Sequence, residues 1–135
     1  MSSVGSYVRW PSVVQISVGT TSVIVRGQGV SLDPATKLAR IAQTADHLYG
    51  IATSDADTDL GYVAVAAGKG GYSVAVKPAT GVTFAVGDLV YYDAAGQSGN
   101  FTNVVGTGQG AIVLGWIVDK NVDGQGNVEM VYNLN

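Results

Sequence analysis

The chain has 135 residues, of which 47% are apolar and only 13% charged, and it carries a net charge of −3 and no cysteine. The longest apolar run, residues 111–118, is too short to cross a bilayer, and the seven lysines and arginines form no cluster that would bind nucleic acid. The absence of cysteine excludes disulfides and thiolate zinc sites. The apolar surplus must lie in a core or against other proteins, which favours an oligomer or a docked surface.

The first twelve residues form a small, polar leader before the first convincing strand. They have no basic start followed by an apolar stretch, so we expect no secretory signal and synthesis in the cytoplasm. Tyr7, Trp10 and Pro11 are the larger residues of this leader. They either pack back on their own domain or anchor it to a neighbouring subunit, because Trp and Tyr are enriched at binding hot spots. We therefore predict an extended N-terminal arm over residues 1–12, with these three as its capsid or subunit contacts.

Residues 13–135 are predicted to form a single, mainly β domain. Short bursts of Val, Ile, Thr and Tyr show period-two alternation, and Gly, Asp, Asn and Ser fill the joints between them. The nineteen glycines fit a chain with many tight turns. The predicted strands are residues 13–18, 22–26, 29–33, 48–53, 60–67, 72–77, 82–86, 88–93, 101–105, 112–118 and 127–132.

The segment DPATKLARIAQTAD, residues 33–46, is open to two interpretations. As a helix it has Asp33 as N-cap, Pro34 at the first helical position and apolar residues at helical spacing. As a hairpin, DPAT is the turn and KLARIA, residues 37–42, is a strand.

An internal comparison favours the strand. GQGVSLD, residues 27–33, aligns with GDLVYYD, residues 87–93, with Gly, Val and Asp matched in both. After the second Asp comes AAGQSGN, which cannot sustain a helix because Gly and Ser disfavour helical backbone. By analogy, residues 37–42 are predicted to be a strand.

The comparison extends along most of the chain. Gly50 matches Gly115, and in both copies a second glycine follows eleven residues later. We therefore predict an internal repeat of residues 27–65 and 87–130. Trp116, which directly follows the matched Gly115, is expected to fill the core.

Two acidic loops contain partial calcium-binding patterns. DKNVDGQG places Asp119, Asn121 and Asp123 in the order that opens a calcium loop, but the twelfth position, which should be a bidentate Glu, is Met130. In DADTDLG, residues 55–61, the glycine falls one place late. Asp-Gly is also a strong tight-turn dipeptide, so we expect turns without metal and keep Asp119, Asn121 and Asp123 as the candidates for one.

No set of residues points to catalysis. His47 is the single histidine, and no serine nucleophile lies near it in the sequence. Asp88 and Asp93 are five residues apart, so they lie on opposite faces of one strand. GKGG, residues 68–71, lacks the hydroxyl residue that follows the Lys of a phosphate-binding loop. We expect no enzyme activity and no cofactor.

Two parts of the chain resemble known phage proteins. GVTFAVGDLVYYDAAGQSGNFT and GWIVDKNVDGQGNVEMVYN resemble the bacteriophage capsid cement family, in which a GD-x-V-Y-x-D strand precedes a late glycine and a closing V-x-V strand. GVSLDPATKLARIAQTADHLYGIATSDADTDLGYVAVAA is similar to the lambda-type head decoration protein in its L-D turn, K-L strand and following glycine. Together these stretches cover about residues 27 to 133, and the order and spacing of the motifs carry the resemblance.

This resemblance implies a compact β-tulip or small β-barrel domain that forms a homotrimer on the outside of an icosahedral head. It implies an N-terminal arm that contacts the major capsid protein, and neither catalysis nor a cofactor. We therefore expect a phage head decoration (cement) protein, made in the host cytoplasm and carried on the virion exterior. It would bind the expanded capsid and stabilise it against internal DNA pressure.

Two alternatives remain at this stage. A calcium-dependent extracellular β module would use the aspartates of DADTD and DKNVDG, and chelators would lower its melting temperature. A phage tail or fibre component would be found at a different position in assembled virions.

Overall fold

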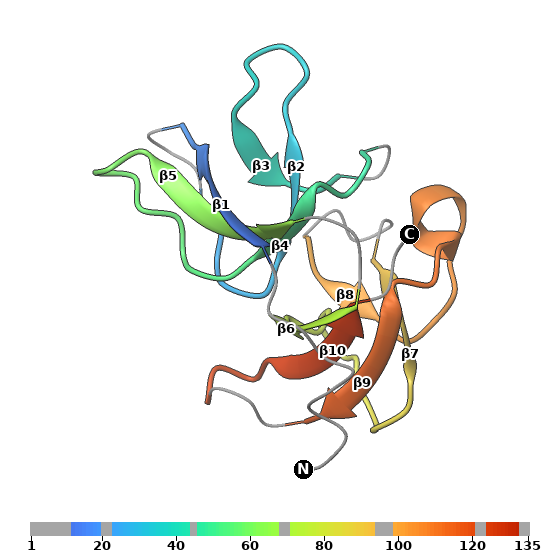
Figure 1. Ribbon diagram of the computed structural model, residues 1–135. Coiled ribbons are helices and arrows are strands. Elements are labelled where there is room, and N and C mark those ends of the chain that lie inside the picture. Colours follow the sequence, from blue (N-terminus) through green and yellow to red (C-terminus); the bar gives the residue numbers. More distant parts are fainter. Residues whose placement is uncertain are drawn as a thin grey trace.

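Strand pairing in the computed structural model divides the chain into two antiparallel sheets of five strands each (Figure 1). The prediction of a mainly β domain is confirmed, but the sheets stay open and form no closed barrel. Within the stretches that the structure describes, no helix has the length and hydropathy needed to cross a membrane. Those stretches are residues 12–19, 23–43, 46–67, 71–93, 99–120 and 124–132.

The first sheet has the strand order β1-β5-β4-β2-β3. Its longest pairing runs from Ser12 opposite Ala67 to Ser17 opposite Tyr62. The strands are β1 (Ser12–Ser17), β2 (Gly29–Leu32), β3 (Ala39–Ile41), β4 (Gly50–Ala52) and β5 (Tyr62–Ala67).

The second sheet repeats this arrangement, with the order β6-β10-β9-β7-β8. In each sheet, therefore, the first strand pairs with the fifth, and the fourth lies between the fifth and the second. A short 3-10 turn, η1 (Gly108–Ala111), precedes the fourth strand of the second sheet. The strands are β6 (Tyr72–Val76), β7 (Leu89–Tyr92), β8 (Phe101–Thr102), β9 (Gly115–Asp119) and β10 (Val128–Tyr132).

The segment after Asp33 is a hairpin, so its interpretation as a strand is confirmed and the helical alternative is wrong. The Asp33 carboxylate accepts a 2.8 Å hydrogen bond from the Ala35 N–H, and the Asp33 N–H donates to the Leu38 carbonyl at 2.9 Å. Lys37 adopts a φ of +63°, which no helix interior contains. These bonds close the turn, and β3 begins after it at Ala39.

Two predicted strands, residues 22–26 and 82–86, are wrong in their described parts, where the structure has turns and irregular backbone. Each segment ends in a turn whose third residue is a glycine with positive φ, Gly27 at +94° and Gly87 at +93°. The side chain of the fourth residue accepts a hydrogen bond from the first N–H, at 2.9 Å for Gln28 and 2.8 Å for Asp88. These local bonds replace the strand pairing that the apolar pattern suggested.

Two hydrophobic cores follow from this layout. One lies on the inner face of the first sheet and includes Val30, Ala52 and Val63. The other lies on the inner face of the second sheet, and it also receives Ile51 and Ala66 from the opposite face of the first sheet. The first sheet is therefore apolar on both faces at its centre, and one of these faces rests on the second sheet.

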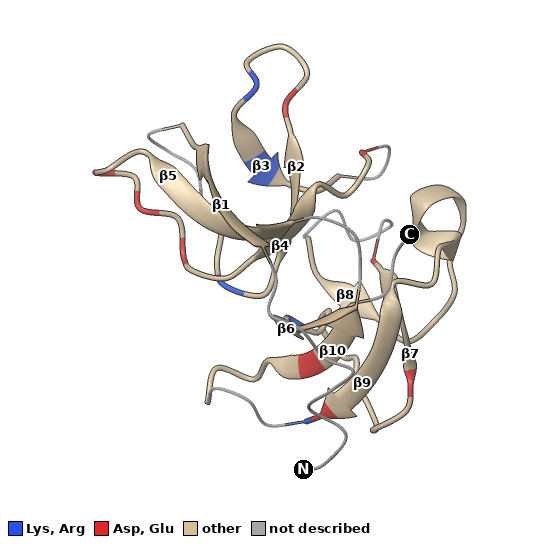
Figure 2. Ribbon diagram, in the orientation of Figure 1, with Lys and Arg blue, Asp and Glu red and all other residues tan. Residues whose placement is uncertain are grey.

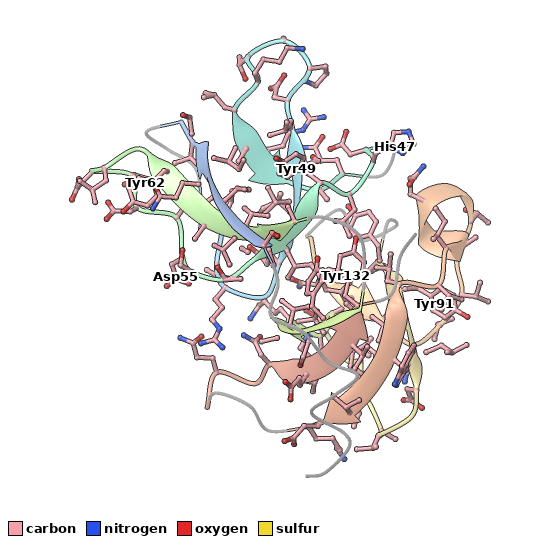
Figure 3. The ribbon with its side chains drawn as sticks, in the orientation of Figure 1. His47, Tyr49, Asp55, Tyr62, Tyr91 and Tyr132 are labelled. Atoms are coloured by element: carbon pink, nitrogen blue, oxygen red, sulfur yellow. The ribbon has the colours of Figure 1, made fainter. Side chains whose placement is uncertain are left out.

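Backbone and side-chain hydrogen bonds join the two sheets. The Lys77 N–H donates to the Gly27 carbonyl at 2.9 Å, and the Gly29 N–H donates to the Gly99 carbonyl at 2.6 Å. Tyr132, at the end of β10, lies between the sheets and is buried (Figure 3). These contacts make the two sheets parts of one packed unit.

Candidate interaction surface

Several residues singled out in the sequence lie outside the described part of the chain. These are Tyr7, Trp10 and Pro11 of the arm, and Asn121 and Asp123 of the second acidic loop. The roles predicted for them stay predictions. Of the metal candidates, Asp119 is described, and it is the exposed last residue of β9.

The aspartates of DADTDLG accept hydrogen bonds that stabilise the turn before β5 and a neighbouring loop. Asp57 Oδ1 accepts hydrogen bonds from the N–H groups of Asp59 and Leu60, at 3.1 and 3.0 Å. Asp55 Oδ1 accepts a 2.9 Å bond from the Arg26 N–H, and Asp55 lies at the side of the first sheet (Figure 3). Among the described residues, no three His, Cys, Asp or Glu side chains gather as a metal site would require.

A polar network surrounds Asp46 beside the β2–β3 hairpin. Its carboxylate accepts bonds from the Ser31 hydroxyl at 2.6 Å, the Gln43 N–H at 3.0 Å and Arg40 Nη2 at 2.8 Å. Desolvation by itself would raise the pKa of the Asp46 carboxyl, but these hydrogen bonds and the Arg40 charge together lower the pKa below its ordinary value. Asp46 is therefore an ionised structural anchor at neutral pH.

This network also brings together a serine, an acid and the histidine, which the sequence alone does not reveal. Ser31, Asp46 and His47 line one shallow depression on the first sheet. The Ser31 side chain is buried and its hydroxyl donates directly to Asp46, while His47 lies exposed on the outer loop (Figure 3). In a nucleophilic triad the serine bonds to the histidine, so this arrangement is not one.

The outer face of the second sheet carries exposed apolar side chains. Trp116 and Val118 project outward from β9, because alternate strand residues point to opposite sides and Ile117 points into the core. Leu89 on β7 lies directly opposite Trp116 and is also exposed. We call this surface the Trp116 face, and it consists of Leu89, Tyr91, Trp116, Val118 and Val131.

Four acids and one base, Lys120, lie around the Trp116 face and leave its centre uncharged (Figure 2). Asp88 and Asp93 flank β7, Asp119 ends β9, and Glu129 lies on β10, where it accepts a hydrogen bond from Ser73 (Figure 2). The bond from the Ala85 N–H and a second from Asn103 lower the pKa of the Asp88 carboxyl, which keeps it ionised. An apolar centre with a charged rim is the usual anatomy of a protein interface.

The expectation that Trp116 fills the core is wrong, because its side chain is 39% exposed. The inward positions of β9 belong to Gly115 and Ile117, which are buried on either side of it. Tyr91 and Tyr92 point to opposite faces of β7, with Tyr92 buried and Tyr91 only partly covered beside β9 (Figure 3). The run LGWIV is apolar throughout, so the sequence does not show which of its residues face outward.

Comparison with known proteins gives one finding. A family model described as phage cement protein matches residues 8–131, which include both sheets except the last residue of β10, and the whole Trp116 face. No curated protein and no solved structure gives a significant match to the chain.

Proposed function

Because the chain belongs to the phage cement protein family, we propose that it binds the outer surface of the expanded phage head and stabilises the shell against the pressure of packaged DNA. Family membership makes it a capsid-associated structural protein of the virion. The match over residues 8–131 is the observation that carries the proposal, because it covers nearly the whole chain. The major capsid protein is the proposed partner.

The mechanism we propose is mechanical. Expansion of the shell exposes new sites at three-fold or quasi-three-fold positions, and a preformed trimer of this β domain caps them. Each subunit bridges neighbouring capsomers, so that many modest contacts add through multivalency. Two features of the chain support this proposal: the low share of charged residues, 13%, and the exposed apolar side chains of Leu89, Trp116 and Val118 on paired strands of one sheet.

The N-terminal arm is proposed to supply part of the contact. Tyr7, Trp10 and Pro11 are aromatic or rigid residues in a polar segment, and such residues concentrate binding energy when they enter a pocket on a partner. Trp10→Ala should weaken binding to heads about tenfold or more. Leu60→Ala, a change of an exposed residue in the turn before β5, is the matched control and should bind like the unchanged chain.

Binding to heads tests the proposal. The full chain is mixed with expanded heads and with proheads of its own phage, and the bound fraction is measured by sedimentation. We expect binding to expanded heads alone, and a higher temperature of DNA release from heads that carry it. Equal binding to both particles, or to neither, would contradict the proposal. Antibody labelling in electron micrographs of virions should mark the head, and labelling of the tail would assign the chain to another structure.

A further inference from the structure

The two sheets share individual hydrogen bonds as well as strand order. The Gly27 N–H donates to the Ala52 carbonyl at 2.8 Å, and the Gly87 N–H donates to the Ile117 carbonyl at the same distance. Both bonds join the turn before the second strand of a sheet to the fourth strand of that sheet. Positions in one sheet therefore have direct counterparts in the other.

Each sheet has an outer row of three residues that lie side by side on its fifth, fourth and second strands. The register of the strands places the two rows at corresponding positions. The first outer row is Ala66, Ile51 and Gly29, and the second outer row is Val131, Trp116 and Leu89.

The first outer row is completely covered. Ile51 and Ala66 are both 0% exposed, and they belong to the core built on the second sheet. Gly29 is covered as well, since a Cβ there would lie 2.7 Å from Leu48 Cδ1 and 3.3 Å from Phe101 Cζ. Within this chain, therefore, the outer row of one sheet is a packing surface for the next sheet.

The second outer row has the same position and larger residues, but much of it is open. Trp116 stands at the position of Ile51, and Leu89 stands at the position of Gly29. Trp116 is 39% exposed and Leu89 is 47% exposed. A monomer gains nothing from an exposed Trp and Leu side by side at the centre of a sheet. Both side chains lie on paired strands, so the surface is already formed before any partner binds.

We propose that the Trp116 face is the contact through which one copy of this chain packs on a second copy. The occupant is inferred from the fold itself: a copy brings a sheet of the same design as the one that already covers the first outer row. The inference rests on the proposed self-association of the chain, but it does not depend on binding to a capsid.

The charges indicate how the copies are arranged. Four acids, Asp88, Asp93, Asp119 and Glu129, and one base, Lys120, lie around the Trp116 face, so its rim is negative on balance. If two such faces met about a two-fold axis, their acidic rims would be brought together, and like charges at an interface oppose binding. The contact is therefore head to tail, with the Trp116 face of one copy on a different surface of the next. A head-to-tail contact that closes on itself produces a ring, such as a trimer.

Sedimentation of the purified full chain, without heads, tests this contact. The unchanged chain should sediment as a closed oligomer, and Trp116→Glu should weaken self-association about 30-fold or more, since it places a charge at the centre of a buried contact. Leu60→Glu, which introduces the same charge at another exposed apolar residue, should leave the oligomer intact. Circular dichroism should show the same β content in all three proteins. A monomeric unchanged chain, or an oligomer unaffected by Trp116→Glu, would overturn the inference.

A second measurement avoids any change to the sheet. In Trp10→Phe the one remaining tryptophan is Trp116, and its emission should shift to the red when dilution dissociates the oligomer. An emission that does not change on dissociation overturns the inference. Deletion of residues 1–11 tests whether the N-terminal arm, and not a second copy, covers the Trp116 face. If the deletion shifts the Trp116 emission to the red while the oligomer stays intact, the arm covers the face and the inference fails. Loss of head binding by Trp116→Glu with an intact oligomer would assign the face to the capsid and also overturn it.

Discussion

Gly50 and Gly115 hold the same place in the two sheets, each against the backbone of the last strand of its own sheet. A Cβ on Gly50 would lie 2.3 Å from the Ala66 carbonyl oxygen, and one on Gly115 would lie 1.9 Å from the Val131 carbonyl oxygen. Both carbonyls belong to strands that are hydrogen-bonded to neighbours, so neither can move away alone. The two glycines therefore set how closely the fourth and fifth strands of each sheet approach.

Gly115→Ala is expected to destabilise the fold by about 3 kcal/mol, because the added methyl group forces β9 and β10 apart. Urea denaturation followed by circular dichroism measures the free energy of unfolding. Gly106→Ala is the control, since the nearest atom to its Cβ would be 3.5 Å away, and it should change the free energy by no more than about 0.5 kcal/mol. Similar values for both variants would show that the close approach at Gly115 is not limiting.

The strand pattern of this chain is largely predictable because polar and apolar residues alternate where one face of a sheet is buried. Tyr72, Val74 and Val76 alternate in the sequence, and all three are buried on one face of β6. The matched glycines at 50 and 115 likewise reflect a close approach that excludes any side chain. Alternating burial and close backbone approach both restrict the residue type at single positions, so both can be predicted from a sequence.

What could not be predicted depends on packing between distant segments. Residues 82–86 look like a strand, but Phe84 turns into the core and the Ala85 N–H bonds to Asp88, so that no neighbouring strand pairs with them. The exposure of Trp116 likewise depends on which sheet face meets the other half of the molecule. A run of apolar residues is equally compatible with either orientation.

Tyr92→Phe is expected to lower the free energy of unfolding by about 1–2 kcal/mol. The Tyr92 hydroxyl donates a hydrogen bond to the Ala42 carbonyl, which ties β7 to the segment after β3, and both groups are buried. Removal of the donor leaves that carbonyl without this partner in an apolar setting. The control is Tyr91→Phe on the other side of the strand, for which we expect a change within about 0.5 kcal/mol in the same denaturation experiment. Equal effects would mean that the Ala42 bond contributes nothing.

Stability should fall at alkaline pH. Burial raises the pKa of Tyr132 to about 12, and burial together with the nearby Asp46 and Asp93 raises that of Tyr92 to about 12. The pKa of an unfolded tyrosine is about 10. The neutral ring is thus favoured by folding, and its contribution is fully present below about pH 10 and is lost as the pH rises towards about 12.

Denaturation at a series of pH values, with tyrosinate absorbance recorded in parallel, checks this alkaline window. We expect a free energy of unfolding that is level up to about pH 10 and then declines, with tyrosinate appearing as the protein unfolds. Tyr92→Phe should show a shallower decline, because one of the buried ionisable rings is gone. A steady free energy of unfolding through this window would contradict the prediction.

Asp46→Asn is expected to destabilise the first sheet by about 1 kcal/mol at neutral pH and to change its response to acid. The carboxylate receives hydrogen bonds from Ser31, Arg40 and the Gln43 N–H, and a neutral amide replaces an acceptor oxygen with a donor. Since folding lowers the pKa of Asp46, its contribution is present above the unfolded value of about 4 and is lost as the pH falls through the folded value.

The acid response separates this role from a general loss of stability. Between neutral pH and about pH 3, the unchanged chain should lose more stability than Asp46→Asn, so the two denaturation curves should converge as the pH falls. Asp59→Asn removes an equal charge from an exposed turn and should match the stability of the unchanged chain at neutral pH. If Asp46→Asn instead kept a constant difference from the unchanged chain down to acid pH, the effect would come from packing and not from the ionised carboxylate that holds Ser31 and Arg40 together.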